Sequence, residues 1–107
     1  MTNVNVSGDA LLAALTALAN PHRLRVIAAL SSGRNYVSQL ARDLEMSRPL
    51  LHMHLHKLEE AGLVTSTLEL GADGKAMRYI EAVPFVLTLT PGAIAEAART
   101  LSGDPAS

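Results

Sequence analysis

The side chains best suited to binding chemistry are concentrated in one short stretch near the middle of the chain. Arg48, His52, His56 and Lys57 can all donate hydrogen bonds to anionic or carbonyl oxygens. An arginine can reach the O6 and N7 of guanine, a histidine can donate to N7 or to a phosphate, and Met53 can touch a thymine methyl group. The types and spacing of these residues therefore suit contact with DNA.

A helix that begins at Arg48 would put these side chains on one face. Leu51, Leu55 and Leu58 recur at i, i+4 and i+7, which predicts a single buried stripe. Ser47 is a good N-cap, and glycine just after the stripe ends the helix at Gly62. Proline in the first turn costs no hydrogen bond. The side chains opposite or beside the stripe are Arg48, Pro49, His52, Met53, His56, Lys57 and Glu60.

A second short helix precedes this one. The sequence VSQLARDL, residues 37–44, places Leu40 and Leu44 on one face, and Glu45-Met46 forms the turn. Two short helices around a tight turn predict a helix-turn-helix, whose second helix would be the recognition helix. Arg42, in the first helix, and Ser47, at the turn, are then candidate DNA contacts. The remaining arginines of this half, Arg23, Arg25 and Arg34, are either phosphate contacts or solvent-facing residues of their helices.

A β-hairpin follows the predicted recognition helix. VTSTLEL suits a strand, GADGK suits a turn with Asp73-Gly74 at its tip, and the return strand starts at Ala76 and bends or stops pairing at Pro84. A hairpin in this position is a wing. Lys75 and Arg78 would contact phosphates or the minor groove from it, or they are ordinary surface charges.

Three more helices complete the predicted fold. Residues 22–30 would bury Leu24, Ile27 and Leu30, whereas Gly8 to Ala19 and Pro91 to Leu101 are poor in charge and apolar on more than one face. We expect those two to pack against a second copy of the chain. Residues 1–7 are expected to be frayed and 103–107 to be a tail.

Composition limits the possible functions. The chain has 107 residues, which predicts a single domain over residues 1–107, ordered from about 8 to 101. It has no cysteine, which excludes disulfides and thiolate metal sites and agrees with a cytoplasmic location. We expect neither a signal peptide nor a membrane span. The net charge is −1, yet six arginines or lysines oppose four acids between Pro21 and Gly62, a locally basic segment.

The order of these elements resembles the ArsR/SmtB family of winged-helix transcriptional regulators. The resemblance covers residues 10–101 and rests on NPHRLRVIAAL, on QLARDLEMSRPLLHMHLHKLEEAGLV and on the LTP that opens the last helix. It implies a mainly α fold with a small β-hairpin, a winged helix-turn-helix that dimerises through the first and last helices and binds operator DNA. Family members are often released from DNA by a metal or another signal. The family's cysteine-bearing metal site is replaced here by YVSQLARDL, and PGAIAEAARTL lacks the histidine of its other common site.

A histidine metal site and an enzyme are weaker hypotheses. Only His52 and His56 share a face of the helix, and a metal site needs three or four ligands. His54 points toward the core and matches a histidine that is usual in the family's helix. We therefore expect no metal, no cofactor, and DNA binding that does not respond to zinc, arsenite or thiol oxidants. The sequence contains neither a glycine-rich phosphate loop nor a paired-carboxylate pocket that would predict catalysis. We therefore do not expect the protein to be an enzyme.

The sequence thus predicts a homodimeric repressor that binds double-stranded DNA at a pseudo-palindromic operator, with an unknown effector and no membrane partner. The alternatives are a winged-helix protein-interaction module with weak DNA binding, favoured by the near-neutral charge and by Met53, and a metal sensor that uses His52 and His56.

Overall fold

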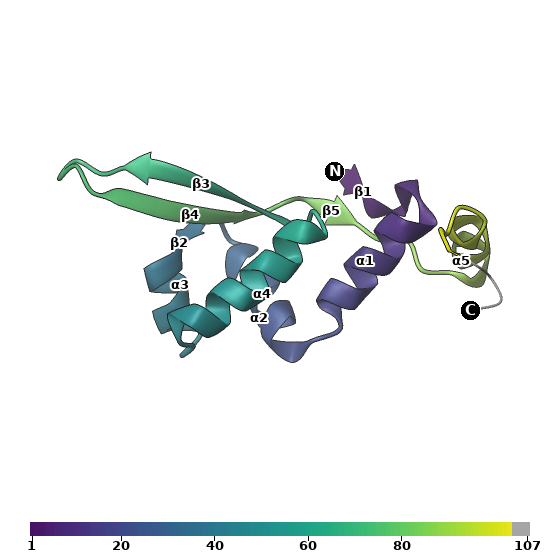
Figure 1. Cartoon of the computed structure of the whole chain (residues 1–107), viewed down its shortest axis with the longest axis horizontal. Coiled ribbons are helices and arrows are strands. Elements are labelled where there is room, and N and C mark those ends of the chain that lie inside the picture. Colours follow the sequence, from purple (N-terminus) through teal and green to yellow (C-terminus); the bar gives the residue numbers. More distant parts are fainter. Residues whose placement is uncertain (104–107) are drawn as a thin grey trace.

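The computed structural model describes residues 1–103 of the chain as an elongated molecule of 54 × 25 × 22 Å (Figure 1). Its wing lies at one end and its last helix at the other. In chain order the elements are β1 (Thr2–Asn3), the 3-10 helix η1 (Val4–Val6), α1 (Gly8–Leu18), α2 (Pro21–Leu30), β2 (Asn35–Tyr36), α3 (Val37–Asp43), α4 (Arg48–Glu60), β3 (Val64–Leu70), β4 (Ala76–Ala82), β5 (Phe85–Val86) and α5 (Pro91–Ala98). Of the predicted tail, residues 104–107 lie outside the described residues.

The helix-turn-helix is confirmed in α3 and α4. The Oγ of Ser47 accepts a hydrogen bond from the backbone N–H of Leu50 at 3.3 Å, as an N-cap should. Glu45, in the turn, has a φ of 52°, and Gly62, after α4, has a φ of 74°. The left-handed backbone at Gly62 ends the helix and sends the chain into β3.

The core lies between α2, α3, α4 and the base of the hairpin. The predicted stripe of α4 is buried, and its partners from the other elements are Val26, Leu30, Leu40, Leu63, Val64 and Ile80. The prediction that Leu24 faces inward is wrong, because its side chain is 54% exposed. Val26 is buried instead, and residues two apart lie on nearly opposite sides of a helix. Ile27 is partly buried, and Leu30 is buried as predicted.

The hairpin forms the predicted wing and carries a third strand that the sequence did not predict. β3 and β4 pair antiparallel from Val64↔Ala82 to Leu70↔Ala76, and β2 pairs with the other edge of β4. Tyr36 is the residue that caps α3, without a side-chain hydrogen bond. A two-residue strand is too short to show alternation, which is why the sequence pattern around Asn35 and Tyr36 did not predict β2. Pairing in β4 ends at Ala82, just before Pro84.

The N-terminal segment is structured, so the prediction that residues 1–7 are frayed is wrong. β1 pairs in parallel with β5, Val4 is buried, and the side chain of Asn5 exchanges two hydrogen bonds with the backbone of Thr88 (3.0 and 2.8 Å). Both partners lie more than 80 residues away in the chain. Local pattern cannot predict such long-range pairing.

α1 and α5 pack together at the end of the molecule farthest from the wing (Figure 1). The backbone N–H of Gly8 donates to the Oγ1 of Thr100 at 2.8 Å, and a Cβ at Gly8 would clash with the carbonyl oxygen of Ala97. Thr90, the threonine of the LTP that opens the last helix, caps α5 by accepting a hydrogen bond from the backbone N–H of Ala93. The absence of a side chain at Gly8 thus permits the close crossing of α1 and α5.

Candidate nucleic-acid interface

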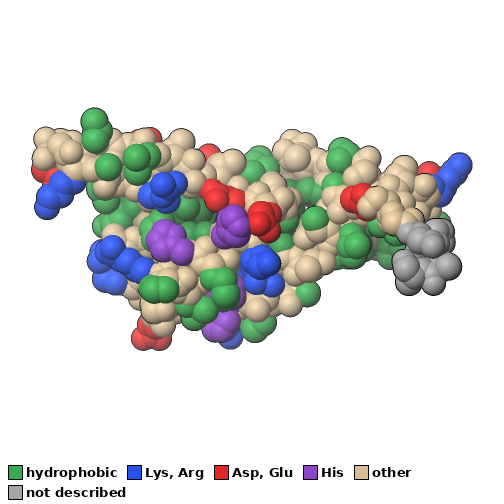
Figure 2. Space-filling model, in the orientation of Figure 1, with side chains coloured by type: hydrophobic (Ala, Val, Ile, Leu, Met, Phe, Trp, Pro, Cys, Tyr) green, Lys and Arg blue, Asp and Glu red, His purple; other side chains and the backbone are tan. Residues whose placement is uncertain are grey.

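The outer face of α4 presents the side chains that the sequence selected. All six candidates on this helix are exposed, because the leucine stripe fixes the opposite face in the core; they are Arg48, Pro49, His52, Met53, His56 and Lys57. Figure 2 shows Lys, Arg and His side chains gathered over α4 and the hairpin, with acidic side chains among them. This face has the exposure that a DNA-contacting helix requires.

Two hollows lie between α4 and the hairpin, and the same two residues line both. The first hollow has a volume of about 360 Å³ and brings Arg48 and His52 of α4 together with Arg78 of β4. The second, about 370 Å³, is lined by His52 and Arg78 with His56 and Glu59. The structure thus places three predicted contacts, Arg48, His52 and Arg78, around one concave surface.

Arg78 is anchored by residues that sequence reasoning missed. Its Nη1 donates to the Oγ of Ser66 at 3.2 Å, and that Oγ donates to the Oε1 of Glu59 at 2.7 Å. Arg78 pairs with Leu68 across the hairpin, so Ser66, two residues earlier, lies on the same face. The alternation of β3 and β4 was therefore the signal that could have found Ser66.

Lys75 lies apart from this surface, in the turn at the far end of the wing. Its backbone N–H donates to the Oδ1 of Asp73 at 3.0 Å, and its carbonyl accepts from the N–H of Gly71 at 2.8 Å. These bonds fix the turn and leave the exposed Lys75 side chain at its tip.

The four arginines that precede α4 in the chain separate into two groups. Arg23 donates from Nε to the carbonyl of Ala17 at 2.6 Å, and Arg34 pairs with Glu69 at 2.6 Å while stacking over the ring of Tyr79. Both side chains are therefore engaged by other groups of the same chain. Arg25 and Arg42 are exposed, and Arg42 donates to Gln39 of its own helix at 2.7 Å.

The three histidines of α4 have different environments. His56 pairs with Glu60 at 2.7 Å, and both side chains are largely exposed, whereas His52 is exposed beside the hollows. Within residues 1–103, no group of three or more His, Cys, Asp or Glu side chains could hold a metal ion. His52 and His56 thus have no third metal-ligating side chain beside them in the described part of the chain.

His54 is buried, as the sequence predicts, and its side chain is 2% exposed. Arg23 donates from Nη1 to His54 Nδ1 at 3.3 Å, so the ring hydrogen belongs on Nε2, which has no hydrogen-bond partner. Burial lowers the pKa of His54, and the charges of Arg23 and His22 lower that pKa further. His54 is therefore a neutral packing residue that links α4 to α2.

Comparison with known proteins identifies the family. Residues 20–66 match the family described as bacterial regulatory protein, arsR family. The chain is 41% identical over 69 residues to the uncharacterized HTH-type transcriptional regulator MJ0229 of Methanocaldococcus jannaschii, a match that covers 64% of this chain and 72% of that protein. The chain belongs to the ArsR family. It is a winged helix-turn-helix transcriptional regulator, as the resemblance implied.

Two other similar proteins agree with this assignment. The HTH-type transcriptional regulator CmtR of Mycobacterium bovis is 41% identical over 63 residues, which are 59% of this chain and 50% of CmtR, so the match spans half the length of that relative. The homodimeric winged helix-turn-helix DNA-binding domain of Mb0332 from Mycobacterium bovis, a possible ArsR-family regulator, matches with a TM-score of 0.61 and 27% identity over 69% of this chain and 64% of that one. In the described part of this ArsR-family chain, no helix is long and apolar enough to cross a membrane.

Proposed function

We propose that this ArsR-family protein is a homodimeric repressor that binds a pseudo-palindromic operator through α4 and the wing. The observation that carries the proposal is the concave surface on which Arg48, His52 and Arg78 meet. A recognition helix contacts base edges with its N-terminal residues, while a neighbouring element contacts the backbone. Such a protein acts where the DNA is, in the cytoplasm.

Base contacts are assigned to the exposed face of α4. Arg48 is the first residue of the helix and has no salt bridge within the described residues. Its guanidinium is therefore available for a bidentate contact with guanine. His52, one turn further, lies beside the same hollow and can donate to a base or a phosphate. Met53 is 48% exposed and would contact a thymine methyl group. Pro49, His56 and Lys57 complete the contact face, and Ser47 caps it.

Backbone contacts are assigned to the wing and to α3. Arg78 faces the same hollow as α4, Lys75 is exposed at the tip of the wing, and Arg42 is exposed on α3. Contacts of this kind position the protein on DNA without selecting sequence. The net charge of −1 does not exclude such contacts, because six arginines or lysines oppose four acids between Pro21 and Gly62.

The dimer is assigned to α1 and α5. Between them runs an almost entirely apolar groove lined by Gly8, Leu11, Leu12, Leu15, Ile94, Ala97, Ala98 and Leu101. Leu12 is 56% exposed and Ile94 49% exposed, so a monomer would leave this apolar surface in water. The related Mb0332 domain is homodimeric, which supports the same assembly here. A two-fold axis through this groove would present two copies of α4 to two half-sites, hence the pseudo-palindrome.

The test is selection of binding sites from a random duplex library, followed by fluorescence anisotropy on the selected and scrambled duplexes. The proposal predicts an inverted repeat, bound at least about a thousandfold more tightly than the scrambled duplex. Reporter transcription from a promoter that carries the repeat should fall when the protein is present. A single half-site, or increased transcription, would contradict the dimeric repressor.

The exposed leucines of the wing favour a second candidate, a protein-interaction module. Leu68 is 62% exposed and Leu70 is 79% exposed, beside the charges assigned to DNA. Equal affinity for selected and scrambled duplexes would favour this module, in which the wing contacts another protein.

A further inference from the structure

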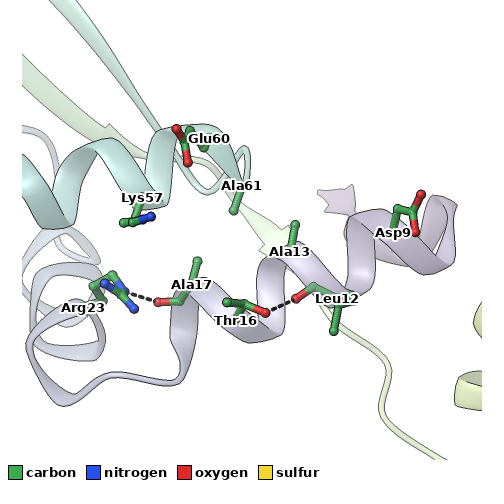
Figure 3. Close-up of a pocket in the computed structure, with 9 residues that line it drawn as sticks. All are labelled: Asp9, Leu12, Ala13, Thr16, Ala17, Arg23, Lys57, Glu60 and Ala61. Carbon is green, nitrogen blue, oxygen red and sulfur yellow. Dashed lines mark hydrogen bonds between the residues drawn. The ribbon is translucent and has the colours of Figure 1, made fainter. Parts of the chain in front are cut away.

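A further cleft is separate from the two hairpin hollows, and Lys57 is the one residue that it shares with the proposed DNA contacts. It lies between α1 and the C-terminal half of α4, is closed at one end by the start of α2, and has a volume of about 630 Å³ (Figure 3). Its apolar lining comes from Leu12, Ala13, Ala17 and Ala61. Sites for small molecules have volumes of this size and an apolar lining with a few polar groups.

Two cations stand together at one end of the cleft. Figure 3 shows Arg23 and Lys57 at the end nearest α2 and Asp9 at the opposite end. Arg23 is fixed by its bonds to Ala17 and His54, both of which leave its positive charge uncompensated. Neither cation forms a salt bridge within residues 1–103. Arg23 is partly buried and Lys57 is exposed, so this end carries two positive charges with no anionic partner among the described residues.

The acids of the cleft are already engaged. Asp9 accepts from the backbone N–H of Ser102 at 3.0 Å, which holds the pKa of Asp9 below its ordinary value. Glu60 is paired with His56 at 2.7 Å. An ionised Asp9 at the far end would repel a second negative charge there. The cleft therefore suits a molecule with one anionic end and an uncharged, apolar body.

We propose that this cleft binds a small organic monocarboxylate, with its carboxylate between Arg23 and Lys57 and its apolar body against the alanines, and that its occupancy alters DNA binding. Lys57 and Ala61 belong to α4 and its cap, and Arg23 is bonded to His54 of α4, so the ligand would contact the recognition helix and a residue tied to it. Leu12 lines both this cleft and the groove assigned to the dimer. The effect on DNA rests on the proposed function, whereas the binding does not.

Binding is tested without DNA, by titrating sodium octanoate into the ¹⁵N-labelled full chain and following amide chemical shifts. Saturable shifts are expected at residues 13, 17, 57 and 61, and octylammonium, with the same apolar body and the opposite charge, should give none. Lys57→Met should weaken octanoate about tenfold or more, because a charged hydrogen bond is lost. Lys75→Met makes the same change at the wing tip and should leave the affinity unaltered.

Three results would overturn the binding site: no saturation at millimolar octanoate, shifts confined to the groove between α1 and α5, or equal affinity in both lysine variants. Ala13→Phe, at an exposed position of α1, fills the cleft and should abolish binding. Its thermal unfolding midpoint reports whether the fold is kept.

The effect on DNA is tested by anisotropy on the selected duplex with and without octanoate. The affinity of the unmodified chain should change severalfold, and that of Ala13→Phe should not. Octanoate binding that leaves the DNA affinity of the unmodified chain unchanged would overturn the regulatory role. If the unmodified chain does not bind DNA even without octanoate, that result would instead contradict the proposed function.

Discussion

Arg78 of the wing donates to the Oγ of Ser66 at 3.2 Å, which holds its guanidinium over the hollow between the hairpin and α4. Arg78→Ala should weaken binding to operator and to scrambled DNA by similar factors. The slope of log affinity against log salt should fall by about one, because one counterion-releasing contact is lost. Anisotropy titrations at several salt concentrations measure both quantities. Arg99→Ala removes the same charge from the C-cap of α5, the helix at the other end of the molecule, and should leave the slope unchanged. An operator-specific loss in Arg78→Ala would instead make it a base contact.

Ile94→Glu should convert the dimer to monomers. Ile94 is 49% exposed and lines the groove between α1 and α5, so the folded monomer tolerates glutamate while the dimer would bury its charge. Sedimentation equilibrium at micromolar concentration measures the mass. Leu24→Glu makes the same change at a 54% exposed position of α2 and should remain dimeric. A monomeric unmodified chain, or a dimeric Ile94→Glu variant, would exclude this interface.

Gly8→Ala should destabilise the contact of α1 with α5. The added Cβ would clash with the carbonyl oxygen of Ala97, and overpacking of this kind costs about 1–3 kcal/mol. The free energy of unfolding in urea measures the loss. Gly92→Ala is the control, because its Cβ would meet Thr90 at an ordinary 4.0 Å. Equal stability of the two variants would mean that the crossing relaxes without cost.

His54 should make stability depend on pH. Its pKa is lowered in the folded state, by burial first and by Arg23 and His22 after it, so below about pH 6.5, its ordinary pKa, the unfolded chain binds more protons at this residue. The free energy of unfolding should therefore fall as pH decreases from 7, and this contribution should level off below the folded pKa. His54→Gln should flatten the dependence measured by urea unfolding. His52→Gln, exposed on the same helix, should retain it, and unchanged slopes in both variants would contradict the assignment.

The helices and the wing were predictable because their signals are local. The leucines of α4, the caps at Ser47 and Thr90 and the glycine at Gly62 each determine structure within a few residues of the chain. The DNA-facing side chains of α4 followed from the same periodicity. These elements agree with one another, which is why their order also indicated the family.

Apart from the orientation of Leu24, the errors came from contacts between distant residues. β1 pairs with β5 and β2 pairs with β4, and each of these two-residue strands is too short to show an alternation of apolar and polar residues. The sequence offers Arg23 as a phosphate contact or a solvent-facing residue. In the structure its guanidinium instead donates to the carbonyl of Ala17 and to the ring of His54. The cleft beside it is formed by three helices, so no single stretch of sequence could reveal it.

The most direct test of DNA recognition by α4 compares Arg48→Ala with the unmodified chain on operator and scrambled duplexes. Arg48 is exposed at the first position of α4 and lines the hollow shared with Arg78. Loss of a bidentate base contact should cost about 1–3 kcal/mol on the operator and much less on the scrambled duplex. Equal losses on the two duplexes would make Arg48 a backbone contact and contradict base recognition from the start of α4.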